Sequence, residues 1–588
     1  MKRFTSIMLL AFALTFTACG NNEQAPATNN EAPATEQTET AETPATEEST
    51  EETTEAEEAT EEAPAETAEE TTASGETTYH SFLSADPESI DAQRGSDVYG
   101  NTIVNNIYEP LLRLVQEGDG LKVEEAAAES YEISDDGMTY TFHIRPDMVW
   151  EDGEPLTAHN FEYGIKRTVD PNTGSGSAFL LADIENFDKV NSGEADLDEL
   201  GVKALDDMTL EIKLAHPATY FTSIIPFRTC FPQREDIVEQ HGEQFGSEAD
   251  TVVGCGPFKL TEWTHNSRLV LEKSDTYWDK DKVSLETIDL KVLGDINARM
   301  NAFQAKEIMS VSTNLPEWTS VFDQLEGVAT APVENPAMDY IAANHADELF
   351  SNLKVRQAFD IAIDREGLNN VAMGGQSTPA YYWVPGAISL NELNYREFAG
   401  EPLKEIKEAN PDAKALLQEG LDELGTGMKP EDLEIELIMV NDPFLKKIGE
   451  YLQQNYQNAL GVKINLELME WPVLSNRVKN GDYQLSYQAW FADYNNPSAM
   501  LSLFTSDAEA VNTGWTSDKY DELIKKAAAE QDDDKAAEYY KEAETILMEE
   551  AVIFPIVTSK TTMYYQDKVE NINTNSFSTA GYKYIKLK

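Results

Sequence analysis

The chain has 588 residues, of which 26% are charged and 41% are apolar, with 107 acidic against 44 basic side chains. This length predicts about two to four domains with sizeable cores. The net charge of −63 excludes a general nucleic-acid-binding protein, because the phosphate backbone would repel it, and disfavours anionic lipid as a partner. Three cysteines, at positions 19, 230 and 255, exclude a disulfide-dense scaffold.

Residues 1–18 have the pattern of an export signal. A basic start, Lys2-Arg3, precedes an apolar run over residues 7–17 that is too short to span a bilayer. The run ends in Ala18-Cys19-Gly20, which resembles the lipobox of bacterial lipoproteins. We therefore expect a lipoprotein signal peptide over residues 1–18 and a lipid on Cys19, which would anchor the protein to the outer face of the cytoplasmic membrane. Ordinary secretion with an incidental cysteine is the alternative.

Residues 19–78 are predicted to be the lipidated cysteine followed by a disordered acidic linker. From residue 20 the segment holds 18 Glu and no Lys, Arg or Asp, with little that is apolar beyond Ala. Such a composition cannot offset the entropy of ordering. A tether to the membrane explains both its composition and its position, whereas an acidic interaction tail is the competing interpretation. The rest of the chain still carries a net charge of −47.

The remaining residues are predicted to form a mixed α/β body. Residues 140–144 and 209–214 alternate between apolar and polar side chains, as half-buried strands do. Residues 400–411 are rich in Gly, Pro and polar side chains, which predicts a turn-rich joint.

Further along the chain, helical and strand patterns alternate. Residues 443–460 have helical spacing after Asp442, a favourable N-cap, and residues 462–468 then alternate as a strand. Two amphipathic helices are expected over residues 517–529 and 534–549, followed by a buried strand over residues 551–557.

Motifs for catalysis or cofactor binding are absent from the sequence. It contains no phosphate-binding loop, no dinucleotide fingerprint and no nucleophile elbow, and its seven histidines form no metal-ligand pair. We therefore expect that the protein is not an enzyme and that it binds neither a cofactor nor a metal. In an exported chain, Cys230 and Cys255 are expected to form one disulfide, with two buried free thiols as the alternative.

A long motif resembles a known family. Residues 129–150, ESYEISDDGMTYTFHIRPDMVW, continue into EDGEPLTAHNF, and GCGPFKL at 254–260 and WFADYNNP at 490–497 follow in order. These segments closely resemble the oligopeptide-binding proteins of ABC importers, the large three-domain class of extracellular solute-binding proteins. The resemblance implies a two-lobed periplasmic-binding-protein-like α/β fold (type II, cluster C).

The resemblance also implies a domain assignment. Lobe I would combine residues 79–98, 221–336 and 557–588, with residues 99–220 as an insert domain on its side. Lobe II would hold residues 337–556. Hinge crossings are expected near Asn335-Pro336 and Pro555-Ile556, so that the two lobes close on a ligand with few backbone changes.

In the family, the aspartate of the motif W-x-A-D-Y meets the α-amine of the peptide, and Asp493 occupies that position here. A buried ammonium needs such a partner. The alternative is a turn aspartate ahead of Asn495-Asn496-Pro497.

Exposed strand edges are expected to bind the peptide backbone, at residues 85–88 on lobe I and 489–491 on lobe II. The candidate ligand-binding residues are Asp493, Trp490, Trp471, Ala489, Phe491, Tyr340, Tyr163, Asp86 and Glu88. Four aromatic residues are expected to wall the side-chain pockets, with ordinary core packing as the alternative for each: Trp471, Trp490, Tyr340 and Tyr163. No basic residue for the ligand carboxylate can be assigned, because Tyr487 and Val478 stand where related proteins have basic residues. Arg477 and Lys479 lie nearby. Ligand length is therefore left open.

The expected function is capture of oligopeptides and their delivery to ABC permease subunits driven by cytoplasmic ATPases, by a monomer bound to the membrane through its lipid alone. Other cargo on the same fold is the alternative: a nickel complex, haem, an oligosaccharide or a signalling peptide. An exported hydrolase would need a nucleophile and base that the sequence does not supply. An adhesive or sensory role stays open.

Overall fold

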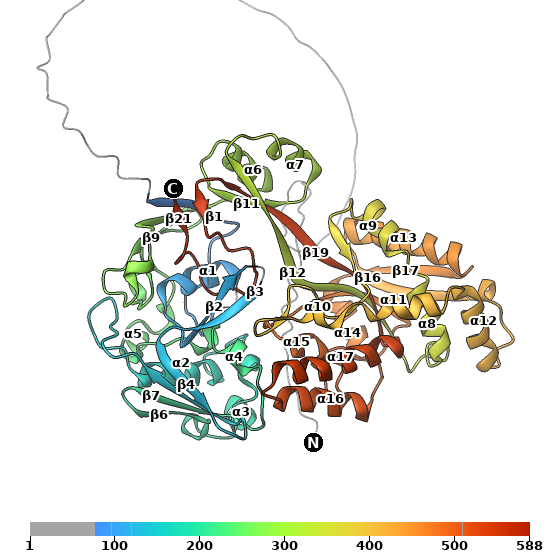
Figure 1. Ribbon diagram of the computed structural model, residues 1–588, viewed down its shortest axis with the longest axis horizontal. Coiled ribbons are helices and arrows are strands. Elements are labelled where there is room, and N and C mark those ends of the chain that lie inside the picture. Colours follow the sequence, from blue (N-terminus) through green and yellow to red (C-terminus); the bar gives the residue numbers. More distant parts are fainter. Residues whose placement is uncertain (1–76, 96, 119, 509) are drawn as a thin grey trace, which may run out of the picture. The chain divides into compact units, whose positions relative to one another are not determined.

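The structure, a computed structural model, describes residues 77–588 except 96, 119 and 509 (Figure 1). The predicted signal peptide, Cys19 and nearly all of the linker lie outside these residues. Within the described part of the chain, no helix has the length and apolar character needed to cross a membrane.

The first sheet joins the start of the described chain to a segment about 200 residues later. Strand β1 (Thr78–Leu83) pairs in parallel with β10 (Thr287–Val292), and β9 (Arg268–Lys273) and β8 (Phe258–Thr264) continue the sheet antiparallel. Alternate residues of β1 are buried, as a strand with one covered face requires.

A second, antiparallel sheet has the order β4 (Ala128–Ile133), β5 (Thr139–Ile144), β7 (Thr209–Lys213) and β6 (Val202–Asp206). The strands β5 and β7 confirm the two strands predicted from period-two alternation. Helix α2 (Ala158–Val169) packs against β6 and β7.

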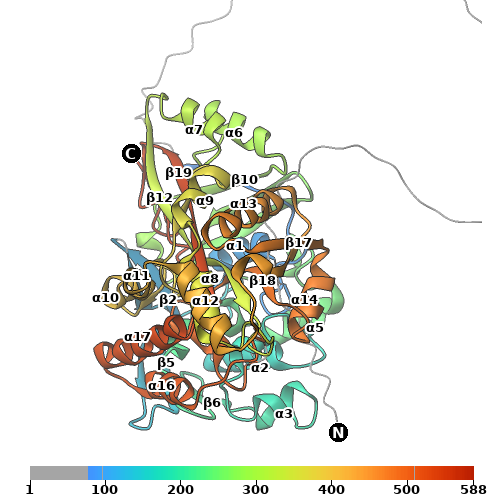
Figure 2. The same cartoon turned by 90° about the vertical axis from the view of Figure 1, so that its right-hand side faces the viewer.

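The large sheet has the order β11 (Ser310–Thr313), β19 (Ile553–Gln566), β12 (Val328–Ala343), β18 (Leu485–Phe491), β16 (Glu434–Val440) and β17 (Lys463–Met469), with β13 (Ser377–Pro379) paired to β19. The long strands β12 and β19 run side by side as an antiparallel pair (Figures 1 and 2). Their register shifts between Glu334 and Met338, so the ladder is interrupted at Asn335-Pro336.

Helices cover both faces of the large sheet. Side chains of α8 (Leu353–Ile361), α9 (Arg365–Ala372), α12 (Ala413–Glu423) and α13 (Pro443–Ala459) share one core with Ile341. Side chains of α14 (Trp471–Lys479), α16 (Asp518–Ala529) and α17 (Asp533–Glu549) share another with Tyr340, the next residue of β12. Adjacent residues of a strand point to opposite faces, so the two cores lie on opposite sides of the sheet.

The helices and strands predicted for the second half of the chain are confirmed. Asp442 caps α13 by accepting hydrogen bonds from the backbone N–H groups of Phe444 and Leu445. The expected joint at residues 400–411 is wrong, because it contains helix α11 (Pro402–Ala409). Pro402 occupies the first helical turn, where proline is tolerated, and Leu403 is buried beneath the helix.

The remaining elements are α1 (Val98–Ile107), α3 (Phe187–Asn191), α4 (Phe221–Ile224), α5 (Glu235–His241), α6 (Ile296–Gln304), α7 (Pro316–Phe322), α10 (Tyr395–Ala399), α15 (Ser498–Leu501), β2 (Leu112–Glu117), β3 (Gly120–Glu125), β14 (Ser389–Leu390), β15 (Leu393–Asn394), β20 (Val569–Glu570) and β21 (Lys586–Leu587). Short 3₁₀ turns complete the described chain.

The expected disulfide is wrong, since Cys230 and Cys255 are both free, buried thiols. Each thiol has its own surroundings in the core. The Sγ atom of Cys255 accepts a hydrogen bond from the backbone N–H of Glu109 at 3.4 Å, and Cys230 follows Thr229 in a 3₁₀ turn. Burial raises the pKa of Cys230 to about 12, which keeps this thiol protonated and unreactive.

Candidate functional site

Strand β18 has a free edge over most of its length. One side pairs with β12 from Leu485 to Phe491, but the other side pairs with β16 only at Leu485 and Ser486. The backbone N–H of Ala492 donates to the carbonyl of Pro336 at 2.8 Å, which fixes the alternation of the ladder. It follows that the N–H and C=O groups of Ala489 and Phe491 point away from β12. Among the described strands, none pairs with them there.

Both edge residues are open to solvent. Ala489 is exposed, and Phe491 is 39% exposed although it is a large apolar residue in a sheet. The structure therefore presents unpaired backbone donors and acceptors together with an exposed ring at one place on β18. An extended chain can add to such an edge as a further strand.

Asp493 lies two residues beyond the end of β18. Its side chain is open to solvent, yet protein surrounds it closely enough that desolvation raises its carboxyl pKa to about 6. None of the described residues gives this carboxylate a hydrogen bond or an ion pair. The site thus holds a carboxylate that lacks a partner.

The turn that follows is built without Asp493. The side chain of Asn495 accepts from the N–H of Ser389 at 2.8 Å, and that of Asn496 accepts from the N–H of Ser498 at 2.9 Å. Asn496 thus makes the side-chain-to-backbone bond within the turn that a turn aspartate would make, and Asn495 ties the turn to Ser389. The alternative interpretation of Asp493 as a turn residue therefore has no hydrogen bond to support it.

This turn also contacts the segment around α4. The ring of Tyr494 stacks on that of Tyr220 with centroids 5.4 Å apart and planes 17° apart. The hydroxyl of Ser223 donates to the backbone carbonyl of Asn495 at 3.2 Å. Asp493 is therefore adjacent in sequence to two residues, Tyr494 and Asn495, that contact residues 220–223.

Of the four predicted pocket aromatics, Trp490 lies closest to the free edge. It is half-buried, stands opposite Met338 on β12, and its indole Nε1 is buried without a hydrogen-bond partner in the described chain. Tyr340 is fully buried and packs edge-on against Trp383 at 4.9 Å, so it is a core residue beside the site. Trp471 begins α14 and is half-buried against the same core.

Tyr163 and the predicted first-lobe edge do not join this group. Tyr163 lies on α2 and its electrostatic neighbours are Arg167, Glu235 and Glu239. Strand β1 ends at Leu83, so the edge strand expected at residues 85–88 is not formed.

Asp86 has a structural partner instead. Its carboxylate accepts from the indole Nε1 of Trp263 at 3.0 Å and from the imidazole Nδ1 of His265 at 2.7 Å, which anchors the loop to β8. Glu88 is exposed, and its backbone N–H donates to Asp97 at 3.3 Å.

A second carboxylate close to the free edge was missed by sequence reasoning. Asp339 stands opposite Ala489 in the β12–β18 ladder, and its Oδ2 accepts from the Tyr487 hydroxyl at 2.7 Å. Burial raises the pKa of Asp339 to about 6. The available signal was one acidic residue within the otherwise apolar run of residues 337–343.

Arg477 is not available to a ligand carboxylate. It pairs with Glu436 and Glu467 at 2.8 Å each and with Asp482 at 3.4 Å. Lys479 is exposed at the end of α14.

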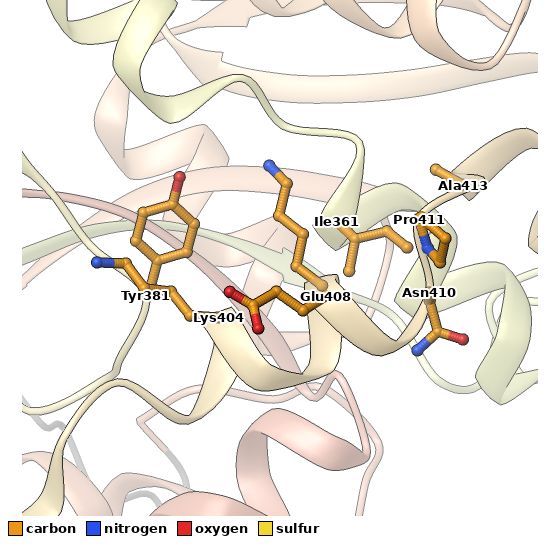
Figure 3. Close-up of a pocket in the computed structure, with 8 residues that line it drawn as sticks. Ile361, Tyr381, Lys404, Glu408, Asn410, Pro411 and Ala413 are labelled. Carbon is orange, nitrogen blue, oxygen red and sulfur yellow. The ribbon is translucent and has the colours of Figure 1, made fainter.

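A separate hollow of about 370 Å³ lies elsewhere in the molecule, lined by Ile361, Tyr381, Lys404, Lys407, Glu408, Asn410, Pro411 and Ala413 (Figure 3). None of the residues around the free edge lines it. Lys404 in α11 pairs with Glu401, the residue just before the helix, so its charge is already balanced. The described chain contains no group of three or more side chains placed to hold a metal ion.

Comparisons with known proteins match most of this chain. Residues 122–512 match the model of bacterial extracellular solute-binding proteins, family 5 middle. The dipeptide-binding protein DppE of Bacillus subtilis is 34% identical over 516 residues, which cover 88% of this chain and 92% of DppE.

Solved structures also match most of this chain. Listeria monocytogenes OppA bound to peptide is 30% identical with a TM-score of 0.63, over 87% of this chain and 99% of OppA. The unliganded open form of MppA, a periplasmic murein tripeptide binding protein, has a TM-score of 0.76 at 24% identity, over 87% of this chain and 97% of MppA.

These findings confirm the expected fold class, a two-lobed periplasmic-binding-protein-like α/β fold of the large three-domain class. They also confirm that the protein is a transport receptor and not an enzyme. As an extracellular solute-binding protein, it acts outside the cytoplasm. The chain belongs to family 5 of the bacterial extracellular solute-binding proteins.

Proposed function

We propose that this protein captures oligopeptides with a free N-terminus and delivers them to the permease of an ABC importer. The observation that carries the proposal is the unpartnered carboxylate of Asp493 at the end of a free strand edge. Relatives named for binding dipeptides and peptides support the choice of cargo.

The ammonium of the peptide would meet Asp493. Enclosing a positive charge without a counter-charge costs several kcal/mol, whereas Asp493 supplies a carboxylate that the empty protein already desolvates in part. Binding then pairs the ammonium of the peptide with the carboxylate of Asp493, so that neither charge lacks a partner. This preference selects ligands with a free amine.

The peptide backbone would add to the edge of β18. Outward-pointing N–H and C=O groups of Ala489 and Phe491 bond any sequence alike, because every residue but proline offers the same main-chain groups. With its amine at Asp493, beyond the C-terminal end of β18, the ligand would run antiparallel to this strand. Sequence preference would come from the side-chain surroundings, including Trp490.

Closure would involve lobe II, residues 337–556, and lobe I, which combines residues 79–98, 221–336 and 557–588 and carries the insert 99–220. The interrupted ladder at Asn335-Pro336 supports a hinge there, since a gap in strand pairing leaves torsions free to change. The lipid on Cys19 and the linker up to residue 78 would keep the receptor near its permease.

The test is calorimetry with a pentapeptide that is either free or acetylated at its N-terminus. We expect the free peptide to bind and acetylation to weaken binding at least about 30-fold, corresponding to about 2 kcal/mol. Asp493→Asn should weaken binding of the free peptide by a similar factor and leave the acetylated peptide unchanged.

Asp281→Asn is the matched control, because Asp281 is another exposed aspartate for which the structure shows no partner and it lies in a 3₁₀ turn away from β18. It should bind like the unaltered protein. Equal affinity for free and acetylated peptide would refute the role of Asp493, and mass spectrometry that finds a non-peptide ligand co-purified with the protein would refute the choice of cargo.

A further inference from the structure

The face of the large sheet that carries Asp339 is open next to the free edge. In an antiparallel ladder, directly opposite residues place their side chains on the same face. Asp339 and Ala489 are such a pair, and Tyr487 and Phe491 flank Ala489 on that face. Tyr487 is buried in the core below, whereas Ala489 and Phe491 are exposed. The covering helices therefore stop short of this point.

The carboxylate of Asp339 is only partly compensated. The Tyr487 hydroxyl donates to Oδ2 at 2.7 Å, and this is the one hydrogen bond that any described residue gives to the side chain. No lysine, arginine or histidine of the described chain forms an ion pair with it. Asp339 is half-buried, so its carboxylate remains reachable from the open face.

We propose that Asp339 and Tyr487 form a second ligand subsite, which binds the positively charged side chain of a lysine or arginine in the bound peptide. This inference rests on the proposed function, because it needs a peptide on the edge of β18. Alternate side chains of an added strand point to the same face of the sheet. Every second ligand residue would therefore lie on the face that carries Asp339, and the nearest of them would meet the carboxylate.

The geometry selects long side chains. A ligand strand at the free edge would lie two strand spacings from β12, roughly 10 Å, because adjacent strands are about 4.8 Å apart. The methyl group of Ala489 leaves the path across β18 open. Lysine and arginine have flexible stems that span such a distance, whereas the two-carbon stem of diaminobutyrate is too short.

The neighbouring groups fit a cation with an apolar stem. The exposed ring of Phe491 can cover the methylene groups, and the carboxylate of Asp339 meets the charge. Tyr487 holds the carboxylate in place through its hydroxyl. Burial disfavours the ionised form of Asp339 and so raises its pKa, and a cation beside the carboxylate offsets that cost.

The test uses pentapeptides with free N-termini that carry lysine, norleucine or diaminobutyrate at each position in turn. Norleucine keeps the apolar stem without the charge. By calorimetry, we expect one position at which lysine binds roughly 5- to 10-fold tighter than both norleucine and diaminobutyrate, as a partly buried ion pair allows. Asp339→Asn should abolish this difference and leave the norleucine peptide unchanged.

Asp323→Asn is the matched control. Asp323 also accepts a hydrogen bond from a tyrosine, Tyr564, at 2.9 Å, but it follows α7 and does not belong to β12 or β18. It should keep the full preference for lysine. Tyr487→Phe provides a second variant should Asp339→Asn unfold. It keeps the carboxylate but removes the hydroxyl that holds it, so the preference for lysine should shrink while the norleucine peptide binds as before.

The outcomes separate the two proposals. Failure of the unaltered protein to bind any of the peptides would refute the proposed function. Binding of the norleucine peptide without a lysine preference at any position, or a lysine preference that survives in folded Asp339→Asn protein, would overturn the subsite alone. If Asp339→Asn does not fold, a lysine preference that is unchanged in Tyr487→Phe would overturn it as well.

Discussion

Peptide affinity should depend on pH through Asp493. The protein around this side chain raises its carboxyl pKa to about 6, and only the ionised form attracts an ammonium. Because ligand binding favours the ionised form, affinity should be highest near pH 7, where the α-amine of the peptide is still protonated, and fall as pH drops through 6.

The size of the effect follows from the fraction of ionised carboxylate. With a pKa of about 6, affinity should be about twofold weaker at pH 6 and about tenfold weaker at pH 5 than at pH 7. The charge of the peptide changes little between pH 5 and 7, since an α-amine titrates near 8 and an α-carboxyl near 3.5. The slope therefore reports on the protein.

The assay is calorimetry from pH 5 to 7 with an alanine- and leucine-containing peptide. Such a peptide has no cationic side chain, so Asp339 does not contribute. The Asp493→Asn protein should show weak binding that is nearly independent of pH, and the Asp281→Asn control should keep the slope. An affinity that stays constant down to pH 5, or a slope that persists in Asp493→Asn, would contradict the reasoning.

Three further predictions concern the edge, the core and the thiols. Ala489→Pro should weaken binding of all peptides at least about tenfold in the same assay while leaving the melting temperature nearly unchanged, because proline removes an outward N–H from an edge; unaltered affinity would exclude backbone pairing there. Glu544→Ala should cost about 3–5 kcal/mol in urea unfolding, because it strands the buried charge of Arg396, which donates to it at 2.7 Å; a loss below 1 kcal/mol would show that the pair is dispensable. Alkylation of the denatured, unreduced protein followed by mass spectrometry should modify Cys230 and Cys255, whereas a peptide that links the two would show a disulfide.

Patterns of local origin could be predicted from the sequence. The strands β5 and β7 and the helix α13 follow from periodicity and from the Asp442 cap, because one covered face imposes its period on the sequence. Helix α11 was missed because Pro402 and its polar neighbours are typical of joints as well as of a first helical turn. Composition alone does not separate the two.

Features that depend on distant contacts were harder to predict. The pair of Asp339 and Tyr487 is set by a strand register that joins residues 148 positions apart, and no local pattern encodes that register. The same limit explains the wrong disulfide, since the spacing of Cys230 and Cys255 says nothing about where each thiol packs. Asp493 was found only because its motif resembles a family, and its lack of a partner became visible in the structure.

The free edge of β18 also creates a risk of aggregation. Amide and carbonyl groups that can pair with a short extended chain can also pair with the same edge of a second copy of the protein, and such edge-to-edge pairing starts ordered aggregates. Mutual repulsion between chains with a net charge of −63 opposes such an encounter. The excess of Glu and Asp therefore disfavours pairing between two copies of the protein. Salt at 1 M shortens the electrostatic screening length to about 3 Å and should weaken this repulsion.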